Sequence, residues 1–294
     1  MTIPPPRRVL AAGLLAAALT APGLHAHLAT PAGREAPAAL QAPAAPATPA
    51  TPSAPDSPAV PASTAQPASP ATPATPPDPN AQPAPIPYGK TPLGLGDGLR
   101  DGAMYVPKSY RDDTPMPVMV MLHGYSGWGD ELASTFALAE EFGVVIVAPD
   151  SREVTWGRSA PGFDQDVRFI GAAFRKAAQT LNLDPDRVAL AGRSDGAGYA
   201  LSMGLAYGDT FNHVVSIAGG LMSPVRRKGK PKVFIVHGLN DRQMPIERTG
   251  RLFQQQLKDE GYDVTYREYE GGHATPPEVV REVFAWLTGK PFRP

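Results

Sequence analysis

The sequence predicts an α/β fold with a mostly parallel central sheet, helices on both faces of the sheet and no large lid domain. Short apolar runs alternate along the chain with segments whose apolar residues recur every three or four positions, which is the helical period. The runs themselves are almost continuously apolar, as expected for parallel strands buried on both faces. With 294 residues and 42% hydrophobic content, the chain can bury one substantial core.

Each element is expected at a definite place in the chain. The parallel strands are predicted, in chain order, at PVMVML (117–122), VVIVAP (144–149), VALAG (188–192), HVVSIAG (213–219), KVFIVHG (232–238) and VTYREYEGG (264–272). The helices are predicted in ELASTFALAEEF, DVRFIGAAFRKAAQTLN, the alanine-rich YALSMGLAY and IERTGRLFQQQLKDEG. LRDGAMYVP (99–107) is predicted to be an antiparallel edge strand.

The first 87 residues have a different composition. Residues 1–29 place Arg7 and Arg8 before a short apolar stretch, which predicts an export signal, cleaved after Ala26 or kept as an N-terminal anchor. Residues 30–87 hold 18 of the 36 prolines and few large apolar residues, so they predict an extended, disordered linker. Residues 88–294 are then the folded domain of an exported protein, periplasmic or extracellular. The N-terminal segment is the part expected to provide any association with a membrane or cell wall. The chain has no cysteine, which excludes disulfides and thiolate metal sites.

The stretch GRSDGAG places Ser194 between a predicted strand and a predicted helix. A serine on such a sharp turn has a strained backbone, and strand and helix pass so closely that only glycine fits two positions before and after it. Gly192 and Gly196 meet that requirement. The turn exposes the serine oxygen above the amino end of a helix, where unpaired N–H groups favour a developing negative charge.

Two partners for this serine follow in the order that the turn motif requires, first an acid and then a histidine. His273 lies after the last predicted strand, in YEGGHATPP, where Gly271 and Gly272 would leave its loop free to move. Asp241, in HGLNDRQMP, follows the preceding strand and is the expected acid; the alternatives are that it only caps the next helix, or that Asp263 is the acid.

The remaining site residues are expected on loops that leave the same strand ends. The backbone N–H groups of Asp195 and Tyr125 are the candidates for an oxyanion hole. Large aromatic side chains on these loops can form pocket walls or simply pack, and the candidates for substrate binding are Trp128, Trp156 and Phe163. The short link from 219 to 231 leaves no room for a helical lid, which favours short acyl groups or exposed esters of a bulky or polymeric molecule.

These stretches resemble the α/β-hydrolase superfamily, and within it the bacterial phospholipase/carboxylesterase-like and polyhydroxybutyrate-depolymerase-like esterases. The resemblance covers 117–287 and rests on LHGYSGWGD, VIVAPDSR, GRSDGAGYALSMGLAYGD, KVFIVHGLNDRQMPI and YEGGHATPPEV. It implies a serine esterase that needs no cofactor or metal, with small-molecule or polymeric esters as substrates. Arg193 departs from the apolar residue expected before the serine, and the linker is no part of the family.

Other function classes fit less well. Gly89–Thr91 resembles the end of a phosphate-binding loop, but the preceding prolines lack the N–H groups that such a loop needs. The basic run at 226–230 belongs to a chain of net charge −1 and predicts a solvated loop rather than a nucleic-acid site. A peptidase of the same fold and a non-catalytic binding protein that retains the fold remain the alternatives.

Overall fold

The computed structural model describes residues 85–96, 100–157 and 160–291, without the side chains of Ala133 and 160–164. The export signal and nearly all of the linker predicted from the sequence lie outside these residues. None of the helices within these ranges is both long and apolar enough to cross a membrane.

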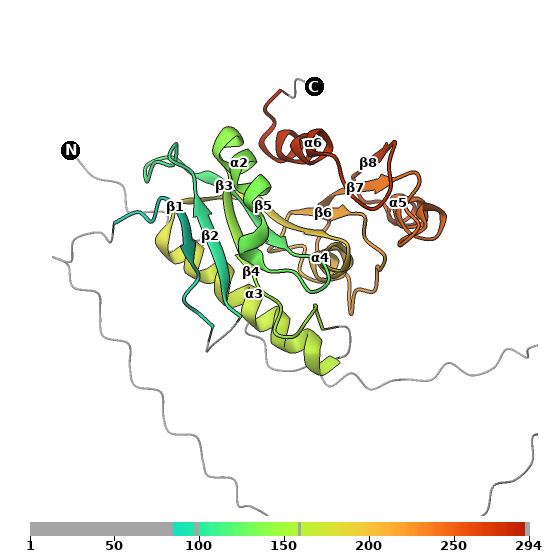
Figure 1. Cartoon of the computed structure of the whole chain (residues 1–294), viewed down its shortest axis with the longest axis horizontal. Helices are drawn as coiled ribbons and strands as arrows, with labels where there is room; N and C mark the ends of the chain where they lie inside the picture. The colour runs from blue at the N-terminus through green and yellow to red at the C-terminus, as the bar shows by residue number, and fades with distance from the viewer. Residues whose placement is uncertain (1–84, 97–99, 158–159, 292–294) are drawn as a thin grey trace, which may run out of the picture. The chain divides into compact units, whose positions relative to one another are not determined.

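The described residues form one sheet of eight strands (Figure 1). The strands are β1 (Gly89–Pro92), β2 (Gly102–Val106), β3 (Met116–Leu122), β4 (Val145–Pro149), β5 (Leu183–Arg193), β6 (His213–Ile217), β7 (Lys232–Gly238) and β8 (Val264–Tyr269). Their order across the sheet is β1-β2-β4-β3-β5-β6-β7-β8, with β3 to β8 parallel and β1 and β2 antiparallel to their neighbours. The prediction of an edge strand at 99–107 was wrong in one respect: β2 is antiparallel, but β1 pairs outside it and forms the edge.

Helices cover both faces of the sheet, which confirms the predicted fold class. They are α2 (Ala133–Phe142), α3 (Ala160–Thr180), α4 (Asp195–Ala206), α5 (Gly250–Asp259) and α6 (Pro277–Thr288), with two short 3-10 helices, η1 (Gly129–Glu131) and η2 (Ile246–Arg248). Figure 1 shows α2 and α6 on one side of the sheet and α3 and α4 on the other.

The strand pattern explains these two layers. Successive residues of a strand face opposite sides, so on β3 Val118, Val120 and Leu122 pack toward α3 and α4, while Met119 and Met121 pack toward α2 and α6. Both sides of β3 are apolar because both are buried. A third cluster joins α4 and α5 over β6 and β7.

Three helices differ from the sequence prediction. Helix α3 begins at Ala160, six residues before the expected start, and takes in Pro161 and Gly162. The segment 246–261, predicted as one helix, begins with only the short η2, and α5 starts at Gly250. Helix α6 had no counterpart among the predicted helices; proline in its first turn is compatible with a helix start.

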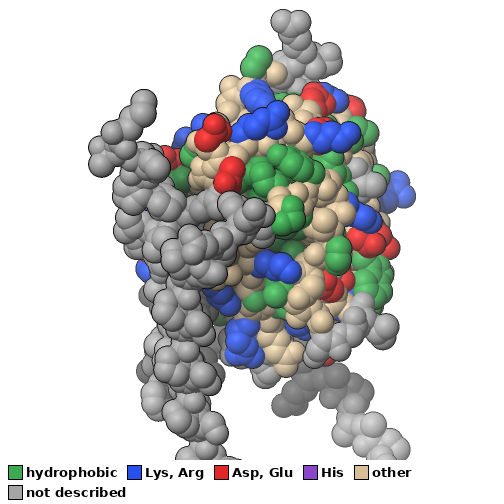
Figure 2. Space-filling view, turned by 90° about the vertical axis from the view of Figure 1, so that its left-hand side faces the viewer, with side chains coloured by type: hydrophobic (Ala, Val, Ile, Leu, Met, Phe, Trp, Pro, Cys, Tyr) green, Lys and Arg blue, Asp and Glu red, His purple; other side chains and the backbone are tan. Residues whose placement is uncertain are grey.

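The loops at the carboxyl ends of β3, β5, β6 and β7 gather at one edge of the sheet. The connection from 218 to 231 forms no helix, in agreement with the absence of a helical lid. On the side of the molecule that Figure 2 shows, basic and acidic side chains are interspersed rather than separated. The basic run at 226–230 is partly neutralised, because Arg227 pairs with Glu260 and Lys228 with Asp209.

Candidate active site

Ser194 occupies the sharp turn between β5 and α4. Its backbone has φ 54° and ψ −119°, which is a strained conformation for a residue with a side chain. A Cβ atom at Gly192 would collide with the backbone of Gly196, and one at Gly196 would collide with the carbonyl oxygens of Leu122 and His123. The two glycines therefore allow the start of α4 to lie directly against the ends of β5 and β3.

The structure brings Ser194 together with the predicted histidine and acid. Nε2 of His273 is 2.9 Å from Oγ of Ser194, and Nδ1 of His273 is 2.8 Å from Oδ2 of Asp241. A carboxylate oxygen can only accept, so Nδ1 carries the proton and Nε2 is left to accept the hydrogen bond of the serine hydroxyl. The three side chains form a continuous hydrogen-bonded chain.

Asp241 is buried in the loop that follows β7. Its Oδ1 atom accepts hydrogen bonds from the N–H groups of Gln243 and Met244, both at 2.9 Å. Burial opposes ionisation, but the hydrogen bonds from Met244, His273 and Gln243 outweigh it and lower the pKa of this carboxyl. Asp241 therefore both caps a turn and faces His273.

The loop that carries His273 is held in place rather than left free. The N–H of Asn240 donates to the carbonyl of Gly271 at 2.8 Å, and the hydroxyl of Tyr269 donates to the carbonyl of Gly272 at 2.9 Å. These bonds hold the loop where His273 reaches Ser194, as expected for its position.

The two candidate oxyanion donors belong to two segments near the serine. Asp195 is the first residue of α4, and Tyr125 belongs to the loop after β3. That loop passes close to the serine, because a Cβ atom at Gly124 would lie 3.6 Å from Cβ of Ser194. The side chain of Asp195 accepts a hydrogen bond from the hydroxyl of Thr155 at 2.9 Å.

Two cavities meet at Ser194. The smaller has a volume of about 150 Å³ and is lined by Trp156, Ser194, Asp195, Gly198, Tyr199, Gly220, Leu221 and Met244. The larger has a volume of about 460 Å³ and is lined by His123, Gly124, Tyr125, Gly127, Trp128, Glu131, Leu132, Arg193, Ser194, Gln243 and His273. The serine oxygen thus lies between a small cavity and a wider one.

The predicted aromatic residues have different positions. Trp128 lines the larger cavity. Trp156 lines the smaller one but is only 2% exposed, and its indole N–H donates to the carbonyl of His123 at 2.8 Å. Phe163 does not lie on a loop as expected: it belongs to the first turn of α3, and its side chain is outside the described residues. Sequence reasoning missed Leu221 and Met244, which lie in loops with no recognisable pattern.

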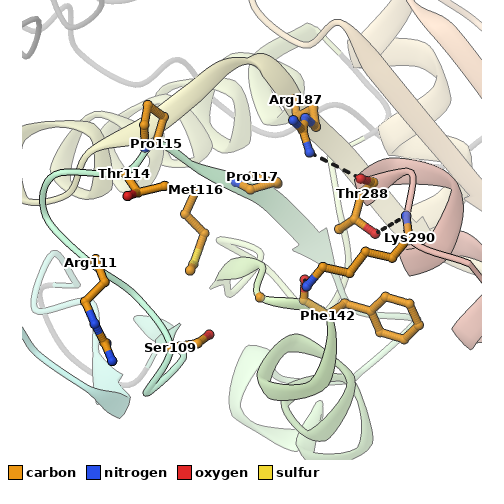
Figure 3. A pocket seen from close by; sticks show the side chains of 11 residues that line it. Ser109, Arg111, Thr114, Pro115, Met116, Pro117, Phe142, Arg187, Thr288 and Lys290 are labelled. Carbon is orange, nitrogen blue, oxygen red and sulfur yellow. Dashed lines mark hydrogen bonds between the residues drawn. The ribbon is translucent and has the colours of Figure 1, made fainter.

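A further cavity, of about 340 Å³, lies at the opposite, amino-terminal ends of β3 and β4 (Figure 3). Two of its three cationic side chains bind helix ends: Lys290 donates from Nζ to the carbonyl of Phe142, the last residue of α2, and Arg187 donates to the carbonyl of Thr288, the last residue of α6. The third, Arg111, donates to the carbonyls of Lys108 and Tyr110 in its own loop. Basic groups at helix carboxyl ends satisfy unpaired carbonyls and the helix dipole. This cavity therefore has a sufficient structural explanation.

Known proteins that resemble this chain are esterases and related hydrolases. Residues 98–277, more than half of the chain, match the Esterase family model, described as "Putative esterase". Acyl-protein thioesterase 1 of Gibberella zeae is 32% identical over 113 residues, which are 35% of this chain and 48% of that protein. "Putative esterase NocK" of Nocardia uniformis subsp. tsuyamanensis is 30% identical over 143 residues, which are 45% of this chain and 42% of that protein. The chain thus spans less than half the length of these curated relatives.

Solved structures show the same fold at low sequence identity. Esterase PE8 superimposes with a TM-score of 0.54 at 22% identity, covering 65% of this chain and 98% of that one. The S-formylglutathione hydrolase FrmB of Staphylococcus aureus gives a TM-score of 0.53 at 16% identity, covering 64% and 92%. With its eight-stranded sheet and the matching family model, the chain has the α/β-hydrolase fold and belongs to the Esterase family.

Proposed function

We propose that this protein hydrolyses carboxylic esters of short acyl groups through a covalent acyl-enzyme. The observation that carries the proposal is the hydrogen-bonded chain from Asp241 through His273 to the hydroxyl of Ser194. That arrangement places a base within reach of a nucleophile and an acid within reach of the base, as acyl transfer requires.

The proposed reaction has two steps. Oγ of Ser194 attacks the ester carbonyl while Nε2 of His273 takes the serine proton, and the resulting tetrahedral intermediate expels the alcohol, which receives that proton from His273. Water then attacks the acyl-enzyme by the same route, with His273 as base and then as acid, and releases the carboxylic acid. Asp241 holds the imidazole in the Nδ1–H tautomer and stabilises the imidazolium that forms in each step.

The oxyanion of each tetrahedral intermediate is proposed to bind the N–H groups of Tyr125 and Asp195. The Asp195 N–H belongs to the first turn of α4, where the helix dipole adds to its positive potential. Pre-oriented donors of this kind supply a large share of the rate enhancement in acyl transfer.

The small volume of the smaller cavity favours a short acyl group as its occupant. Its volume of about 150 Å³ is below the roughly 300–1,000 Å³ of pockets that hold drug-sized ligands. Leu221 and Met244 line it, and Trp156 and Tyr199 pack against each other in its wall.

The size of the larger cavity favours a large alcohol group as its occupant. Tyr125, on its rim, is 64% exposed. An alcohol bound there can extend into solvent, so both a small ester and an acyl group attached to a polymer fit the proposal. The leader and linker at 1–87 support export of the protein, on sequence grounds alone.

The proposal is tested with a fluorophosphonate probe and a series of p-nitrophenyl esters of increasing acyl length. We expect the probe to attach to Ser194, located by mass spectrometry, and hydrolysis to be fastest for the shortest acyl chains. Ser194→Ala should abolish both and retain the circular dichroism spectrum of the wild type. A folded wild-type protein that reacts with neither the probe nor the esters would refute the proposal and favour a binding protein of this fold.

A further inference from the structure

Arg100 lies immediately before β2, and its half-buried guanidinium reaches the loop 123–128 that follows β3. Nη2 donates to the carbonyl of Gly127 at 2.9 Å, and the guanidinium carbon lies 4.1 Å from the ring centre of Trp128. On its other side Nε donates to the carbonyl of Ser151 at 2.6 Å, in the loop after β4. Arg100 thus fastens the loop 123–128 to the loop of the neighbouring strand.

The same guanidinium fixes the protonation of His123. Nη2 of Arg100 is 3.3 Å from Nε2 of His123, and the N–H of Ser151 donates to that nitrogen at 3.0 Å. Arginine and a backbone N–H can only donate, so Nε2 must be unprotonated and the proton is on Nδ1. Burial of this ring, which lowers the pKa of His123, also favours the neutral form.

The proton on Nδ1 of His123 orients the peptide between Gly124 and Tyr125. Nδ1 donates to the carbonyl of Gly124 at 2.7 Å, and the N–H of Gly127 donates to the same carbonyl at 3.1 Å. In a planar trans peptide the carbonyl and the following N–H point in opposite directions. Holding the Gly124 carbonyl with two donors therefore fixes the direction of the Tyr125 N–H.

We propose that Arg100 is a positioning residue for the reaction: through His123 and Gly127 it holds the Tyr125 N–H in the direction that receives the oxyanion. The inference rests on the proposed function. In this proposal Arg100 does not touch the substrate. Replacing it should therefore weaken stabilisation of the transition state, which lowers kcat, rather than binding of the substrate, which would raise KM. This role requires arginine, because its guanidinium offers separate nitrogens to the carbonyls of Ser151 and Gly127, whereas lysine has a single nitrogen.

The test compares Arg100→Gln and Arg100→Lys with the wild type, all as the full chain. The matched control is Arg226→Gln, since Arg226 also donates to a backbone carbonyl, that of Ala206, and lies over an aromatic ring, that of Tyr207, away from Ser194. For p-nitrophenyl acetate we expect Arg100→Gln to lower kcat about 10- to 100-fold with KM changed less than about two-fold. Arg100→Lys should give an intermediate loss, and Arg226→Gln should keep the wild-type kcat.

A second measurement separates positioning from general destabilisation. A trifluoromethyl ketone forms a tetrahedral adduct with the serine, and its oxyanion uses the same donors as the transition state. Its affinity should fall across the three variants by the same factor as kcat/KM. Inhibitor affinity that stays at the wild-type value in Arg100→Lys would overturn the inference, as would an equal loss of kcat in Arg226→Gln.

The outcomes distinguish this inference from the function on which it rests. An active wild type with an equally active Arg100→Gln would overturn the role of Arg100 alone. A wild type without esterase activity would overturn both. If Arg100→Gln fails to fold, Arg100→Lys decides the question, because it keeps the positive charge and the aliphatic stem.

Discussion

The two oxygens of the Asp241 carboxylate have different partners, so the turn-capping role and the proposed role as the acid are compatible in one residue. Oδ1 accepts the N–H groups of Gln243 and Met244, while Oδ2 faces His273. The turn therefore fixes the carboxylate in the orientation that the histidine needs. Asp263, the other candidate acid, directly precedes β8. It therefore lies at the amino-terminal ends of the parallel strands, opposite to the carboxyl ends where Ser194 lies.

Replacing Asp241 by asparagine should lower kcat for p-nitrophenyl acetate by about 10³- to 10⁴-fold, as expected when the histidine loses its carboxylate partner and the correct tautomer. The control is Asp263→Asn, which should keep the wild-type kcat. Steady-state kinetics of the two purified variants decide the point; an Asp241→Asn enzyme as active as the wild type would mean that the acid lies elsewhere.

His213, at the start of β6, predicts a pH dependence of stability. Burial, with Lys232 and Arg187 nearby, lowers the pKa of this histidine from 6.5 to about 4, against the opposing effect of Asp184 and Asp263. The folded state binds this proton less tightly than the unfolded state, so the stability is fully present above pH 6.5 and is lost as the pH falls toward about 4.

The measurement is the free energy of unfolding by urea between pH 7.5 and pH 4.5, for the wild type and for His213→Gln. The variant also loses the edge-on contact with Trp286, so its stability at pH 7.5 should be lower. The titration of His213 is identified by the slope of the free energy of unfolding against pH, which should be smaller in the variant between pH 6.5 and pH 4.5. Parallel curves would show that other groups account for the acid sensitivity.

At the scale of elements, the function depends on how closely β5, α4 and β3 approach one another. Three non-glycine residues with positive φ in the described part of the chain, Ser126, Ser194 and Ala218, follow β3, β5 and β6 at the same edge of the sheet. Backbone strain of this kind persists only where surrounding contacts enforce it, and it concentrates at functional sites. The strained turns are therefore a property of the packed elements rather than of one loop.

Gly196→Ala tests this close approach. Its methyl group would collide with the backbone carbonyls of Leu122 and His123, so we expect a loss of about 2 kcal/mol or more in the free energy of unfolding. The matched control is Gly124→Ala, whose methyl group would meet only ordinary contacts at 3.6 Å and should change the stability much less. Urea denaturation measures both, and equal stabilities would contradict the packing at this junction.

The elements that the sequence predicted are those with a strong local pattern. The apolar runs of β3, β4, β6 and β7 are nearly continuous, so their burial on both faces could be inferred directly, whereas β8, VTYREY, is only partly buried. Strand β1, GKTP, has no apolar pattern and exists through its pairing with β2. The first turn of α3 contains a proline and a glycine, residues that usually mark a helix boundary, and the early start of the helix was missed for that reason.

The site residues also divide into those that the sequence predicted and those that it did not. Ser194, Asp241 and His273 follow strand ends in a fixed chain order, and that order made their approach predictable. Arg100 acts on residues 23 to 51 positions away, and no spacing in the sequence indicates such contacts. Trp156 was expected at the pocket, where it does line the smaller cavity, but its burial and its bond to the carbonyl of His123 depend on three-dimensional packing.

At the scale of the whole molecule, the described residues define where the folded domain begins. Ile86 packs against the main core, and the hydroxyl of Tyr88 donates to the carbonyl of Tyr110 at 3.3 Å. The chain thus contributes to the core slightly before residue 88, the boundary expected from composition.

A chain that begins at Pro85 keeps Ile86 and Tyr88 and should therefore unfold within about 1 °C of the full-length protein, because the composition of the preceding proline-rich segment predicts that it buries few apolar side chains. A chain that begins at Leu93 lacks β1 and leaves β2 as an unpaired edge, and should unfold at a clearly lower temperature. Differential scanning calorimetry of the three proteins gives the comparison. A large loss of stability on removing 1–84 would show that this segment is part of the fold.

The two unequal cavities at Ser194 also indicate by which path water reaches the acyl-enzyme in the proposed cycle. The alcohol leaves through the wider cavity while the acyl group stays bound in the smaller one, so the incoming water must arrive by the path that the alcohol has vacated. Any other alcohol present at high concentration can take the same path and accept the acyl group in place of water. The proposed cycle therefore predicts acyl transfer to added alcohols as well as hydrolysis, with the product ratio set by what occupies the vacated space.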